Sequence, residues 1–102
     1  MSQLHAADAN FESTHFSGSA NCSQCHDGLR DEKGKDISIV KNWSTSMMAN
    51  ATRDPYWRAK VASELHRNPS VSDEINDKCS RCHAPMANEA MKKEGVEVSI
   101  FG

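Results

Sequence analysis

The four cysteines of this 102-residue chain constrain its fold more than any other feature, because all of them belong to two copies of one short motif. The copies are Cys22-Ser-Gln-Cys25-His26 and Cys79-Ser-Arg-Cys82-His83. This C-x-x-C-H pattern is the attachment signature of c-type haem. Two thiols three positions apart on one helical turn can each form a thioether with a haem vinyl group. The following His then points its imidazole at the iron as the proximal axial ligand.

Other uses of paired cysteines fit the spacing less well. Zinc ribbons separate their two C-x-x-C pairs by roughly 15–20 residues, whereas residues 26–78 lie between these two pairs. Structural disulfides would not explain why a His follows each pair. A thioredoxin-like redox pair usually lies in a βαβ unit, which this chain lacks. Haem attachment at both motifs is therefore the favoured interpretation.

The composition supports a centre that side chains alone do not fill. Only 37% of the residues are apolar and 6% are aromatic, and a short chain buries a modest fraction of its surface. Such a chain is either partly disordered or is built around something other than side chains. Two haems c, as large flat apolar groups, account for the deficit, and we expect short helices to pack around them.

Charge argues against a nucleic-acid partner, and hydropathy excludes a membrane span. The 14 acidic and 12 basic residues are interspersed, which argues against a nucleic-acid partner. Apolar runs are two or three residues long, far below the length that a membrane span needs.

Periodicity and capping residues predict a mostly α fold, in which short helices are joined by long loops. We expect residues 1–14 to form a loose N-terminal arm and residues 15–102 to form the haem domain. A capped short helix should carry the first motif, and alternation over residues 96–100 allows at most one short edge strand. Two further helices are predicted over residues 38–52 and over residues 55–67, the second with Asp54 as its N-cap. Another should run from Ser70 or Ser72 through the second motif, and a last one should cover residues 86–94.

Together these features resemble a dihaem c-type cytochrome, or a dihaem module of the bacterial multihaem cytochromes c. The likeness covers residues 14–102 and rests on both motifs, on the stretch from Trp43 to Trp57, and on Cys-His-Ala-Pro-Met at 82–86. It implies electron transfer with redox partner proteins and no substrate chemistry, so the chain would not be an enzyme. It also implies a periplasmic or extracellular location, because bacteria attach haem c outside the cytoplasm.

The distal axial ligands are less well determined, because several His and Met residues are available. The resemblance favours His15, just upstream of the first motif, and one of Met47 and Met48, with a slight preference for Met48. His66 is a further candidate at the end of a predicted helix. His5 and Met91 are weaker, and Met86 lies too close to His83 in sequence to reach the far side of the same haem.

Two alternative functions stay open at this point. One haem could keep a labile or open axial site that binds a small ligand, in a catalytic or sensory role. The chain could also be an electron-relay module of a longer protein with further haem domains.

Overall fold

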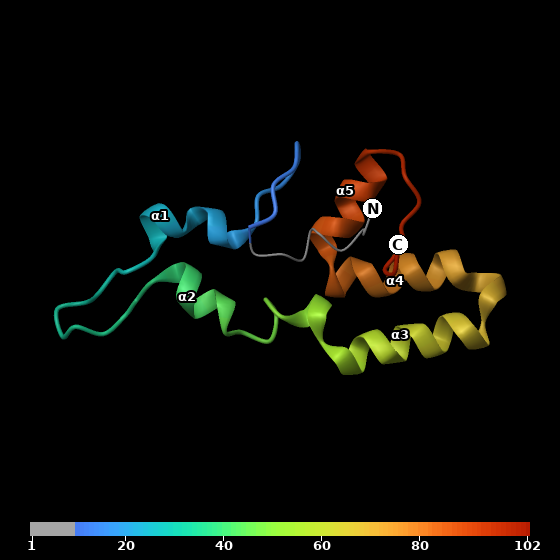
Figure 1. Cartoon of the computed structure of the whole chain (residues 1–102), viewed down its shortest axis with the longest axis horizontal. Helices are drawn as coiled ribbons and strands as arrows, with labels where there is room; N and C mark the ends of the chain where they lie inside the picture. The colour runs from blue at the N-terminus through green and yellow to red at the C-terminus, as the bar shows by residue number, and fades with distance from the viewer. Residues whose placement is uncertain (1–9) are drawn as a thin grey trace.

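Two groups of short helices make up the part of the chain that the computed structural model describes, residues 10–102 (Figure 1). The molecule is elongated, with extents of 57 × 29 × 18 Å. The first group contains the 3-10 turn η2 (Ser19–Cys22), α1 (Ser23–His26) and α2 (Ile39–Ser44). The second contains η3 (Ala51–Arg53), α3 (Pro55–Arg67), η4 (Pro69–Val71), α4 (Ser72–His83) and α5 (Pro85–Lys93). The predicted mostly helical fold is confirmed.

Helix α3 begins and ends where its sequence predicts. The Asp54 carboxylate accepts a hydrogen bond from the Tyr56 amide at 2.9 Å, and Pro55 occupies the first helical position, where a missing N–H costs nothing. Asn68 closes the helix just before Pro69. Trp57 and Val61 form its buried face.

Helices α4 and α5 also match their predicted positions, although α4 begins without a side-chain cap. Its N-cap is Val71, and no side-chain hydrogen bond caps the helix. Helix α5 ends at Lys93, and Gly95 follows with φ of 71°, a left-handed conformation that glycine adopts without strain.

The predicted helix over residues 38–52 is wrong beyond Ser44. Three consecutive hydroxyl side chains, from Ser44 to Ser46, donate hydrogen bonds to backbone carbonyls three residues earlier, at 2.7–3.3 Å. The Asn50 side-chain amide donates to the carbonyls of Ser44 and Ser46. Such local bonds compete with the helical pattern, so turns replace the last two predicted turns of helix.

The first motif is also positioned differently from the prediction. The expected side-chain cap is absent, because no side-chain hydrogen bond caps η2 or α1. Asn21 instead donates to the Phe11 carbonyl at 2.9 Å, which holds η2 against the turn at residues 11–18. Residues 1–9 of the expected arm, including His5, lie outside the described residues, and the boundary of the arm stays a prediction.

The alternating segment 96–100 does not form a strand. Within residues 10–102 the only β-type pairings are two isolated bridges, Glu12 with Ser17 and Arg30 with Asp36. The C-terminal segment is held instead by the Ile100 amide, which donates to the side-chain oxygen of Asn76 at 2.9 Å. The Ile100 side chain is 1% exposed.

Side chains form two small apolar clusters rather than one core. The first consists of Ala84, Ala87 and Met91, with Phe11 and Val98 packed against it. The second consists of Trp57, Val61 and Ile100, with Leu65, Ile75 and Cys79 at its edge. Many large apolar side chains stay exposed, including Leu29, Ile37, Ile39 and Trp43 near the first motif. No helix among residues 10–102 is long and apolar enough to cross a membrane.

Candidate functional site

The second C-x-x-C-H motif occupies the C-terminal end of α4. Cys79 lies at the edge of the Trp57 cluster and is half-buried, whereas Cys82, one helical turn later, is exposed. Burial raises the pKa of the Cys79 thiol, and the nearby Glu64 carboxylate raises it further. All four cysteines of the chain are free thiols. Both thiols of this motif are therefore available for covalent attachment on adjacent turns of one helix.

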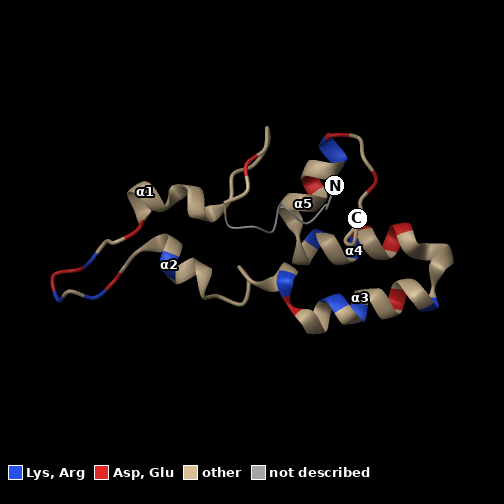
Figure 2. Ribbon diagram, viewed as in Figure 1, with Lys and Arg blue, Asp and Glu red and all other residues tan. Residues whose placement is uncertain are grey.

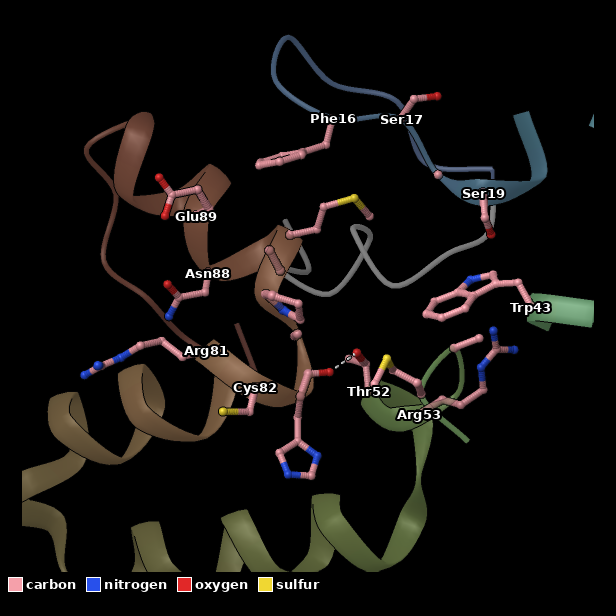
Figure 3. Close-up of a pocket in the computed structure, with 18 of the residues that line it drawn as sticks. Phe16, Ser17, Ser19, Trp43, Thr52, Arg53, Arg81, Cys82, Asn88 and Glu89 are labelled. Atoms are coloured by element: carbon pink, nitrogen blue, oxygen red, sulfur yellow. Dashed lines mark hydrogen bonds between the residues drawn. The ribbon is translucent and has the colours of Figure 1, made fainter. Parts of the chain in front are cut away.

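His83 is held at the end of α4 by contacts from the residues that precede and begin α3. Its imidazole stacks on the Trp57 indole, with ring centroids 4.7 Å apart and planes 8° apart. Its carbonyl accepts a hydrogen bond from Oγ1 of Thr52 at 2.5 Å (Figure 3). The last residue of the motif is thus restrained through both its ring and its backbone.

Ser80, between Cys79 and Cys82, and Asp77, one turn before it, attach α4 to α5. Ser80 is buried, and its Oγ accepts a hydrogen bond from the buried Asn88 amide at 2.8 Å. The Arg81 guanidinium pairs with Asp77 at 2.7 Å, and Lys92 of α5 pairs with the same carboxylate at 2.6 Å. Hydrogen bonds from Lys92, Asn88 and Arg81 hold the pKa of Asp77 well below its usual value. The side of α4 bearing Ser80 is therefore fixed against α5.

A cavity of about 930 Å³ lies beside the end of α4. Figure 3 shows Phe16 and Ser19 on one side, Trp43 and Arg53 on another, and Cys82 on a third. His83, Met48 and Met86 also line it. Its volume falls within the range of about 300–1,000 Å³ typical of ligand and cofactor pockets. The cavity joins segments from both helix groups around the second motif.

The first motif is more open than the second. Cys22 ends η2, and Cys25 and His26 lie in α1, so the spacing again places the residues on one helical stretch. All three side chains are exposed. A hydrogen bond joins the two ends of the loop between α1 and α2. The buried Ser38 hydroxyl accepts it from the Leu29 amide at 2.9 Å.

The candidate distal ligands differ in their exposure and in their position relative to the cavity. Met48 lines the cavity together with Cys82 and His83, whereas its neighbour Met47 does not and is 90% exposed. His15 is exposed and stands edge-on to Phe16, with ring centroids 6.5 Å apart. His66 is exposed near the end of α3. None of these positions tests ligation, so the distal ligands stay predictions.

Sequence reasoning missed the supports of the second motif. The stack of Trp57 on His83 joins α3 to the end of α4 and was not predicted. Asn88 and Thr52 were not singled out, because a lone polar residue carries no periodic signal. The Ser inside the motif was visible, but its buried bond to Asn88 depends on how α5 packs.

The residues at both motifs fit covalent haem c. Each motif supplies two free thiols and a His on one helical stretch, and a cavity of suitable size adjoins the second. Within residues 10–102, no group of three or more His, Cys, Asp or Glu side chains is arranged to hold a metal ion directly.

Comparison with known proteins identifies the family. No curated protein and no solved structure matches the chain. The family model described as "Cytochrome c554 and c-prime" matches residues 21–99, a span that includes both motifs and every helix from α1 to α5. The chain therefore belongs to the cytochrome c554 and c-prime family and is a c-type cytochrome, a haem protein of electron transfer.

Proposed function

We propose that this cytochrome transfers electrons through two haems c, one at each motif, without making or breaking bonds in a substrate. The observation that carries the proposal is that each motif presents two free thiols and a His on one helical stretch. Bound haem would supply a one-electron iron couple. The protein's own part is to attach, ligate and orient each haem and to limit its contact with water.

Each residue of the motifs has a distinct role in this proposal. Cys22 and Cys25 attach the first haem through thioethers, and Cys79 and Cys82 attach the second. His26 and His83 are the proximal ligands. Among the distal candidates, Met48 is supported by its place in the cavity beside His83, and His15 by its position upstream of the first motif.

Unequal axial ligands would give the two haems different reduction potentials. A Met ligand raises the potential relative to a second His. If Met48 ligates one haem and a His completes the other, electrons would pass preferentially from the His/His haem to the His/Met haem. Electron transfer between the two haems would then run mainly one way.

The proposed partners are redox proteins outside the cytoplasm. Both acidic and basic residues occur on α3, on α4 and in the loop between α1 and α2 (Figure 2). A surface of mixed sign suits short-lived encounters steered by local charge rather than tight binding. A periplasmic or extracellular location and neighbouring haem domains in a longer chain are both compatible with this role.

A labile axial position is the second candidate function. All four distal candidates, His15, Met47, Met48 and His66, are exposed, so a small molecule could compete for the iron at one haem. Such a haem would bind ligands in a catalytic or sensory role rather than only pass electrons.

Haem counting on paired cysteine variants tests the proposal. Expressed in a host that attaches haem c, the wild-type chain should carry two haems by pyridine haemochrome assay and by mass. The C22S/C25S and C79S/C82S variants should each carry one. A wild-type chain with a single haem, or a double variant that still carries two, would contradict it.

A further inference from the structure

Trp57 stacks on the ring of His83. The two rings are nearly parallel, with centroids 4.7 Å apart. Trp57 is 8% exposed and belongs to the cluster with Val61 and Ile100. The indole is therefore a fixed surface, and the imidazole lies flat against it.

This stack leaves the ligating atom of His83 available. An imidazole binds iron through the in-plane lone pair of a ring nitrogen, whereas stacking uses the face of the ring. Within residues 10–102, no hydrogen bond to protein holds the ring of His83. Proximal His ligands are commonly oriented by such a bond to their other ring nitrogen. In this protein the stacked contact with Trp57, rather than a hydrogen bond, restrains the His83 ring.

Both members of the stack are also restrained through their backbones. The Thr52 hydroxyl binds the His83 carbonyl, and two residues later the Asp54 cap fixes the start of α3. One short segment thus holds the end of α4 and the beginning of α3 together. The relative position of the two rings follows from that arrangement.

We propose that Trp57 is a positioning residue for the haem ligand His83: its indole sets the plane of the imidazole and keeps water from one face of it. The inference rests on the proposed ligation of haem by His83. Ferric haem carries one more positive charge than ferrous haem, and water stabilises that charge. By excluding water from the ligand, Trp57 raises the reduction potential of this haem.

Three variants separate positioning from general packing. Trp57→Leu removes the flat surface, Trp57→Phe keeps an aromatic ring, and Val61→Ala damages the same cluster without touching His83. The measurements are haem count, two-component redox titration and electron paramagnetic resonance of the ferric protein.

In Trp57→Leu, one of the two potentials should fall, changing the one-electron equilibrium constant by up to about tenfold, or about 59 mV. The resonance signal of the same haem should shift. Trp57→Phe and Val61→Ala should keep that constant within about twofold, although Val61→Ala lowers the melting temperature.

Results that contradict the positioning role differ from those that contradict the proposed function. An equal change in Val61→Ala and Trp57→Leu, or no change in Trp57→Leu, would overturn the positioning role while leaving two haems in place. A wild-type chain without haem at the second motif would overturn the proposed function itself. Should Trp57→Leu fail to fold, a nuclear Overhauser effect between the Trp57 and His83 rings in reduced wild-type protein tests the stack directly, and its absence refutes the inference.

Discussion

Met47 and Met48 are neighbours in sequence but differ in their surroundings. Both residues lie in the turns that follow α2 rather than on a helix, and their side chains are placed differently. Met48 reaches the cavity that contains Cys82 and His83, and Met47 does not. At the scale of single residues, this difference provides a matched pair for testing ligation.

Replacing Met48 should change the haem spectrum and potential, and replacing Met47 should not. Met48→Ala removes the proposed sulfur ligand, so the higher of the two midpoint potentials should fall. The opened position should also let the reduced variant bind carbon monoxide rapidly. Met47→Ala removes the same atoms from an exposed site and is the control. Rapid binding by the wild type would favour the second candidate function, and equal effects of both variants would exclude Met48 as the ligand.

At the scale of elements, α4 both carries the second motif and joins α3 to α5. Asp77 is the centre of the contact with α5, because its carboxylate binds Lys92 of that helix as well as Asn88. These bonds hold the pKa of Asp77 below its unfolded value. A carboxylate with a lowered pKa in the folded state stabilises the fold above its unfolded pKa, about 3.9, and loses that contribution as the pH falls further.

Asp77→Asn should therefore destabilise the holoprotein at neutral pH, and the difference from wild type should shrink as the pH falls below about 4. Thermal unfolding followed by circular dichroism from pH 7 to pH 3 measures this difference. Glu74→Gln, at an exposed carboxylate on the same helix, is the matched control and should show little effect. A difference between Asp77→Asn and wild type that is constant with pH would contradict the assignment.

At the scale of the whole molecule, two small clusters replace a single core. The first is built largely from alanine, and the second contains three fully buried or nearly buried large side chains. Large apolar side chains near the first motif and beside the cavity, including Ile39, Trp43 and Met48, stay exposed. An apolar group tethered at each motif would cover surface of this kind and supply the burial that a chain of this length lacks.

The chain without haem should consequently not fold. A variant with all four cysteines changed to Ser should show little helical signal in far-ultraviolet circular dichroism and no cooperative unfolding. Each paired variant, which keeps one haem, should retain part of the helical signal. Helicity equal to that of the holoprotein in the four-cysteine variant would refute the prediction.

The sequence by itself determined what depends on neighbouring residues. The C-x-x-C-H spacing predicted which residues would attach haem, and Asp54, Pro55 and Gly95 marked helix ends, because caps and turns depend on hydrogen bonds within a few positions. The helix over residues 38–52 failed for a reason that was also local. Hydroxyl side chains from Ser44 to Ser46 bond to the backbone and end the helix, although apolar periodicity continues beyond Ser44.

Only the tertiary structure decided which distant segments meet. The Trp57–His83 stack, the Asn88–Ser80 bond and the placement of Met48 in the cavity each join residues from different elements. Such contacts depend on the angles and distances at which helices pack, and residue patterns within one helix do not encode them. The two attachment motifs are thus visible in the sequence, while the surroundings of the second motif arise from the packing of α3, α4 and α5 around it.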